Sequence, residues 1–131
     1  DSTTKHIKEG SFFKEEYFDN KRVLMNALNT DMYTALYYNP SMQFIPSCSV
    51  GWFEDNKQMK DIYIRMLKAE GINELELATL IKYVGADLYI HYTQNDKQVL
   101  NFEKLKNFGI IPNAIYKNRI IFEIDKKRLM Q

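Results

Sequence analysis

Apolar residues in the first third of the chain recur at three- and four-residue steps and multiples of them. This is the spacing of one buried helical face. We expect a helix here, in one or two pieces, that ends at Asn39-Pro40, because proline disfavours helical geometry at the preceding residue. The predicted stripe consists of Tyr17, Leu24, Leu28, Met32 and Leu36.

The same spacing predicts a second helix over residues 55–70 and a third from Asn73 to residue 84. Asn73 and Glu76 form a capping-box-like pair at the start of the third helix. Gly71 and Gly85 follow the two helices, where a left-handed residue is favoured.

After Gly85 the period changes to two, and residues 88–93 alternate as a strand does. A turn at 94–97 and a short second strand at 98–100 follow. Asn101 caps a short helix that Gly109 ends. Residues 114–116 and 119–124 then form a hairpin.

This order predicts an α+β fold. About three N-terminal helices precede a small, mostly antiparallel sheet with one further short helix and a C-terminal hairpin. The 131 residues suit one core. We expect a flexible lead-in at 1–10 and a single domain over 11–131, with a loop at 40–53 that includes a short edge strand around 42–45.

Composition narrows the function classes. Lys plus Arg total 18 and Asp plus Glu total 17, so the net charge of +1 gives no strong attraction to nucleic acid, which we do not expect as a partner. The single cysteine, Cys48, excludes an internal disulfide and a multi-cysteine metal cage. The sequence contains no run of 18 apolar residues and therefore predicts no membrane-spanning helix. If Asp1 follows a cleaved signal the protein is periplasmic or secreted, and otherwise it is cytoplasmic.

The sequence contains no phosphate loop, nucleophile elbow, CxxC or HExxH motif, so we expect no catalytic residue, cofactor or metal. Carboxylate pairs at Glu54-Asp55 and at Glu74 with Glu76 fall at predicted helix starts, where they favour the helix dipole. His91, Tyr92 and Thr93 are the candidate ligand-binding residues, because a histidine beside tyrosines can orient a ligand. The alternative is a partly exposed strand histidine on the polar face.

Residues 89–93, Tyr-Ile-His-Tyr-Thr, and the helix that Gly109 ends resemble the opening of some ADP-ribosyltransferase-like domains. The resemblance covers about 25 residues and implies that His91 helps to hold a nicotinamide dinucleotide. Only about 20 residues follow, and a catalytic glutamate has no room in its usual order.

The order of helix, strand, turn, strand, helix and hairpin from about Leu75 to Asp125 is similar to the small N-terminal modules of secretins and TonB-dependent receptors. That similarity implies a protein-interaction module of a bacterial envelope assembly, and it rests on element order alone.

Nine tyrosines and eight phenylalanines are the most unusual feature of the composition. Aromatic residues are enriched at protein interfaces, and the candidates are Tyr33, Tyr37, Tyr38, Trp52 and Phe53. Our leading hypothesis is a non-catalytic protein-protein interaction or assembly domain of an envelope or secretion-type complex, with a protein partner or self-association. The alternatives are a small ligand- or nucleotide-binding, enzyme-like domain centred on His91-Tyr92-Thr93, and weak nucleic-acid binding through the basic residues Lys126-Lys127-Arg128.

Overall fold

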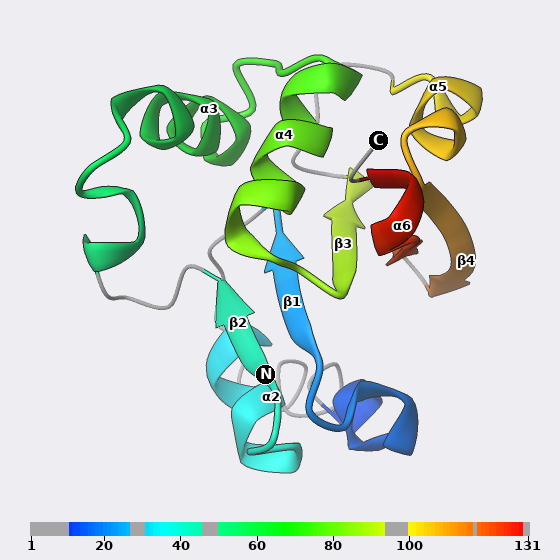
Figure 1. Ribbon diagram of the computed structural model, residues 1–131. Helices are drawn as coiled ribbons and strands as arrows, with labels where there is room; N and C mark the ends of the chain where they lie inside the picture. Colours follow the sequence, from blue (N-terminus) through cyan, green and yellow to red (C-terminus); the bar gives the residue numbers. More distant parts are fainter. Residues whose placement is uncertain (1–10, 27–30, 46–49, 94–99, 117, 130–131) are drawn as a thin grey trace.

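The computed structural model describes residues 11–26, 31–45, 50–93, 100–116 and 118–129. They form an α+β fold around a five-stranded mixed sheet with the order β2-β1-β3-β5-β4 (Figure 1). In chain order the strands are β1 (Arg22–Met25), β2 (Gln43–Ile45), β3 (Leu88–Tyr92), β4 (Ile110–Tyr116) and β5 (Arg119–Ile124).

Strand direction divides the sheet into two parts. β1 lies at the centre of three parallel strands, between β2 and β3. β5 runs antiparallel to both β3 and β4. Two of the four pairings are therefore parallel, so the expectation of a mostly antiparallel sheet is wrong. Parallel pairing needs long crossovers. Here α2 (Asp31–Tyr38) lies between β1 and β2, and α3 (Lys57–Leu67) and α4 (Glu74–Val84) lie between β2 and β3.

Helices pack on both faces of the sheet, and each face has its own apolar cluster. One cluster joins the sheet to α3, α4 and α5 (Phe102–Asn107), and Figure 1 shows α4 over β1 and β3. The other joins the opposite face to α2 and to two short 3-10 helices at the start of the described chain. The helical elements are η1 (Ser11–Lys14), η2 (Glu16–Phe18), α2 (Asp31–Tyr38), η3 (Val50–Phe53), α3 (Lys57–Leu67), α4 (Glu74–Val84), α5 (Phe102–Asn107) and α6 (Lys126–Leu129).

The long helix expected from Tyr17 to Asn39 is wrong in its first half. The described residues form η2, then β1, and the next described helix is α2, so the predicted order of about three helices before any strand is also wrong. Val23 and Met25 enter the cluster under α2, while Leu24 enters the cluster under α4. A strand buried on both faces has a continuous apolar run, and such a run also satisfies a helical template.

The two helices with the clearest caps are confirmed. The Asn73 side chain accepts from the Glu76 N–H, and the Glu76 carboxylate accepts from the Asn73 N–H. Gly85 takes the left-handed conformation, with φ of 69°, that was expected of it. α3 ends earlier than its glycine suggested, because Ala69, with φ of 55°, is the first left-handed residue after it.

The later elements follow the expected order with changed bounds. β3 and α5 lie where the sequence placed them, and Asn101 caps α5. β4 and β5 pair as a hairpin, but β4 begins at Ile110, four residues before the expected start, and α6 follows the pair.

Three expected features lie wholly or mostly outside the described residues: the lead-in at 1–10, Cys48 and the strand at 98–100. Leu100 is described and is not in a strand. Within the described residues, every helix is too short or too polar to cross a membrane.

Candidate functional site

The candidate site lies where β1 and β3 end. The helices next to these strands pack on opposite faces of the sheet, α2 after β1 on one face and α5 after β3 on the other. Adjacent parallel strands whose connections leave to opposite faces form a topological switch point, and open sheets bind ligands at the carboxyl ends of such strands. Buried polar side chains occur at this place in the sheet.

Asn26 is the first residue after β1 and is 2% exposed. Its Oδ1 accepts the Tyr92 N–H at 2.7 Å, and its Nδ2 donates to the Tyr92 carbonyl at 3.1 Å. The side-chain amide thus extends the β1–β3 pairing beyond its last backbone partners, Met25 and Ile90.

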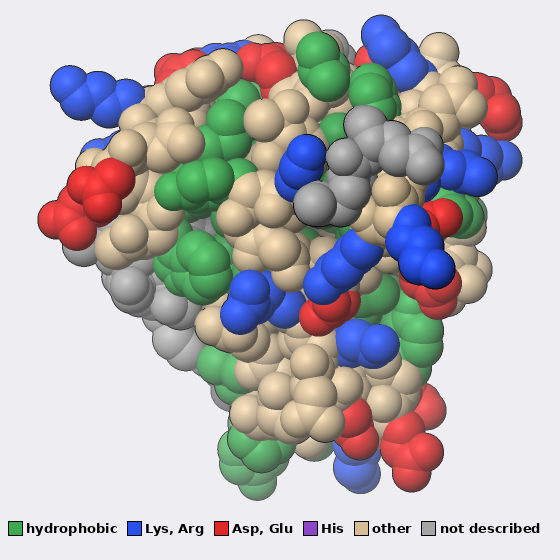
Figure 2. Space-filling view, viewed as in Figure 1, with side chains coloured by type: hydrophobic (Ala, Val, Ile, Leu, Met, Phe, Trp, Pro, Cys, Tyr) green, Lys and Arg blue, Asp and Glu red, His purple; other side chains and the backbone are tan. Residues whose placement is uncertain are grey.

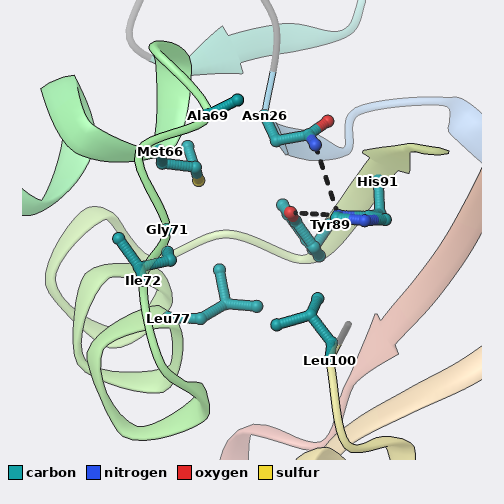
Figure 3. A pocket seen from close by; sticks show the side chains of 9 residues that line it. All are labelled: Asn26, Met66, Ala69, Gly71, Ile72, Leu77, Tyr89, His91 and Leu100. Carbon is teal, nitrogen blue, oxygen red and sulfur yellow. Dashed lines mark hydrogen bonds between the residues drawn. The ribbon is translucent and has the colours of Figure 1, made fainter. Parts of the chain in front are cut away.

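His91 and Tyr89 project from β3 toward α4, because residues two apart on a strand share a face. The His91 Nδ1 lies 2.8 Å from the Tyr89 hydroxyl and 3.3 Å from Asn26 Nδ2. Figure 3 shows these two contacts converging on the His91 ring. His91 is 6% exposed and Tyr89 is 1% exposed, so the three polar groups satisfy one another inside the core.

The three side chains form one wall of a cavity of about 20 Å³ between the sheet and the segment that joins α3 to α4 (Figure 3). Such a volume holds one water-sized group. The other lining residues are uncharged: Met66, Ala69, Gly71, Ile72, Leu77 and Leu100. Ala69 and Gly71 are half-buried, so the cavity lies near the surface at that segment.

The structure places the predicted triad on different sides of the sheet. His91 lines the cavity. Tyr92 belongs to the opposite cluster, where its hydroxyl lies 4.0 Å from the Met25 sulfur and its ring lies 5.3 Å from the Arg119 guanidinium. The Thr93 hydroxyl and N–H both donate to the Asn118 carbonyl. Consecutive side chains on a strand point to opposite faces of the sheet, so Tyr92 lies away from His91. The cavity instead brings His91 together with Asn26 and Tyr89.

Sequence reasoning missed both of these partners. Tyr89 could have been found, because it stands two residues before His91 and must share its face. Asn26 had no local signal, because only the parallel pairing of β1 with β3 brings it to a residue 65 positions away.

Of the five aromatic residues proposed as an interface, the four whose side chains are described do not gather on one surface. Tyr37 is 83% exposed at the end of α2, and its ring packs edge-on against Tyr38. Trp52 is half-buried and Phe53 is buried in the cluster on the other face of the sheet. The side chain of Tyr33 lies outside the described residues.

Carboxylates at the helix starts have structural partners. Glu76 closes the capping box and pairs with Arg65, and this hydrogen bond lowers the pKa of Glu76. Glu74 is buried and accepts from the Asn101 N–H at 3.4 Å, with Lys104 Nζ at 3.8 Å. Within the described ranges, His, Cys, Asp and Glu side chains form no group of three that could hold a metal ion.

Asp87 joins the amino ends of β1 and β3 to α6. Its Oδ2 accepts the Arg22 N–H at 2.8 Å, and its Oδ1 pairs with Lys126 Nζ at 2.6 Å. Partial burial alone would raise the pKa of Asp87, but the hydrogen bonds from Lys126 and Arg22 outweigh it, and the pKa is lowered.

A second, open depression of about 300 Å³ lies beside Asp87, at the opposite end of β3 from the cavity. The Tyr17 hydroxyl donates to Glu123 there at 2.7 Å, and Asn113 donates to Tyr17. Burial, and then the contact with Glu123, raise the pKa of Tyr17. Lys21 and Lys126 line the same depression, so it contains both signs of charge.

The basic C-terminal residues also have internal contacts. Lys126 pairs with Asp87, and the Arg128 guanidinium donates to the Lys106 carbonyl. Figure 2 shows acidic and basic side chains interspersed on one face of the molecule, with hydrophobic side chains over α3 and α4. On this face the charges do not form a single basic patch.

Comparison with protein-family models, curated proteins and solved structures found no significant match.

Proposed function

We propose that the domain binds a small polar ligand at the carboxyl ends of β1 and β3. The single observation that supports this is the group of Asn26, Tyr89 and His91, which meets in the core at a topological switch point. Burying polar groups is unfavourable compared with apolar packing of the same shape, so a polar cluster in this place favours a role in binding.

The cavity limits what enters it. A volume of about 20 Å³ accepts one group of the size of a water molecule. The lining residues named above are uncharged, so the group that suits the cavity is small and uncharged: a carbonyl oxygen or a hydroxyl. The carbonyl oxygen of a nicotinamide dinucleotide's carboxamide meets this requirement, and the rest of such a ligand remains outside the cavity.

A thermal-shift screen tests the proposal. The probes are NAD, NADP, nicotinamide, FAD, AMP and ATP, each with the purified chain. A ligand at a hundred times its Kd stabilises the fold by about 2.7 kcal/mol, and this raises Tm by several degrees. His91→Ala should remove the rise, while Tyr37→Ala, at an exposed position on the other side of the sheet, should retain it. No shift with any probe, or an equal shift in His91→Ala, would overturn the proposal.

We also propose, as a second candidate, that the domain binds a protein partner or a second copy of itself. The observation that favours it is the exposure of Tyr37 at 83% and Ile115 at 77%, the latter on the edge strand β4. Exposed aromatic residues favour contacts, and open strand edges do so as well. An assembly role in a bacterial envelope complex is one form of this candidate.

Sedimentation and size-exclusion chromatography with light scattering test this candidate directly. Self-association should give a mass above that of one chain that rises with concentration. Tyr37→Ser or Ile115→Ser should lower it, and Thr79→Ser, at an exposed position on α4, is the control. A strict monomer that also captures no partner from source extract would contradict it.

A further inference from the structure

We infer that Asn26 and Tyr89 are positioning residues that hold His91 in one neutral tautomer, with its proton on Nε2. Only the use of His91 in ligand binding rests on the proposed function, and the tautomer itself does not. The hydrogen bonds that support it are internal to the protein.

The orientation of the Asn26 amide is fixed by the backbone of a single residue. Tyr92 presents its N–H to Oδ1 at 2.7 Å and its carbonyl to Nδ2 at 3.1 Å. Rotation of the amide by 180° would place Oδ1 against a carbonyl and Nδ2 against an N–H, which breaks both hydrogen bonds. Nδ2 is therefore the atom that faces His91, and an amide nitrogen can only donate.

The donor at Asn26 decides the state of the His91 ring. At 3.3 Å from Nδ2, the Nδ1 atom acts as an acceptor and carries its lone pair. The Tyr89 hydroxyl lies 2.8 Å from the same nitrogen and can direct its proton toward that lone pair. In a neutral imidazole with an acceptor at Nδ1, the proton is on Nε2.

The inference specifies the chemistry that His91 can offer. Nε2–H is a hydrogen-bond donor, so a ligand atom that contacts it must be an uncharged acceptor, such as a carbonyl or hydroxyl oxygen. A proton at Nδ1 would remove the hydrogen bond from Asn26 Nδ2, whereas the Tyr89 hydroxyl could turn and accept from Nδ1–H. Asn26 and Tyr89 fix the direction of this donor.

Imidazole ¹⁵N NMR tests the tautomer in the ligand-free protein. The chain has two histidines, so His6→Gln leaves His91 as the only imidazole. Near pH 8, where an ordinary imidazole is neutral, two-bond ¹H–¹⁵N correlations should show an unprotonated Nδ1 and a protonated Nε2. A protonated Nδ1 in this otherwise native chain would overturn the inference.

Two variants separate positioning from simple packing. Asn26→Asp places a carboxylate oxygen where Nδ2 stood, and the proton should move to Nδ1; Asn107→Asp, on the exposed end of α5, should leave the spectrum unchanged. Tyr89→Phe retains the ring and should raise the Nδ1–H population. If Asn26→Asp does not fold, Tyr89→Phe decides, and unchanged tautomer signals in the folded variants would contradict the inference. Since no ligand is added, failure here is distinct from failure of the thermal-shift screen.

Discussion

Replacing Asn26 with leucine, which has nearly the same shape, tests whether this side chain joins β1 to β3. The variant loses the contacts to the Tyr92 N–H, to the Tyr92 carbonyl and to His91 Nδ1. His91 keeps its contact with Tyr89, so the main cost comes from the two backbone groups of a residue that is 5% exposed. A buried polar group that loses its partner costs about 1–3 kcal/mol. We therefore expect a loss of about 2–4 kcal/mol in the free energy of unfolding.

Urea denaturation followed by circular dichroism measures this loss, and thermal unfolding should show Tm lower by roughly 10 °C. Asn107→Leu is the matched control, because Asn107 is exposed at the end of α5, and it should change stability by less than about 0.5 kcal/mol. A loss below about 1 kcal/mol in Asn26→Leu, with the control unchanged, would refute the argument that Asn26 continues the strand pairing.

Three further predictions concern the framework of the site. Gly109→Ala should lose about 2 kcal/mol or more in denaturant unfolding, because φ is 91° and the added Cβ would lie 2.7 Å from the Asp125 carbonyl oxygen; a neutral result would contradict that geometry. Asn73→Ala should lose about 1 kcal/mol through the capping box, and Asn73→Ser should recover most of it. The lowered pKa of Asp87 means that its stabilisation is complete above the unfolded-state value of about 3.9 and is lost as the pH falls. Asp87→Asn should therefore lower Tm at pH 7 and flatten its decline below pH 4, and an unchanged pH profile would contradict this.

Local sequence signals predicted the later half of the fold. The start of α4 follows from Asn73 and Glu76, and its end follows from Gly85, because caps and left-handed residues act within a few positions of themselves. Asn101 predicts α5 for the same reason. Hydrogen bonds formed by neighbours in the sequence need no knowledge of the sheet.

The parallel part of the sheet could not be predicted in this way. Val23, Leu24 and Met25 face both sides of a central strand, and their apolar run also fits a helical stripe. β2, Gln43–Ile45, lies at the edge of the sheet, where a short strand around 42–45 was expected, but its three residues gave no sign of the parallel pairing with β1. Tertiary pairing decides between strand and helix in the β1 segment.

In the candidate site, too, the sequence predicted what depends on nearby residues and missed what depends on strand pairing. The sequence indicated His91, but its grouping with Tyr92 and Thr93 followed the order of the chain, whereas side chains on a strand group by alternate positions. Tyr89 obeys that rule. Asn26 becomes a partner only when β1 pairs with β3, because that pairing aligns Met25 with Ile90.

The most direct test of the central claim is a backbone and side-chain amide ¹H–¹⁵N map of the protein, recorded with the probe that gives the largest thermal shift. Binding at the switch point predicts that the largest changes occur at the Asn26 side-chain amide and at the backbone amides of His91 and Tyr92. Changes centred instead on Tyr17 and Lys126, at the other end of β3, or a map that no probe alters, would contradict the claim.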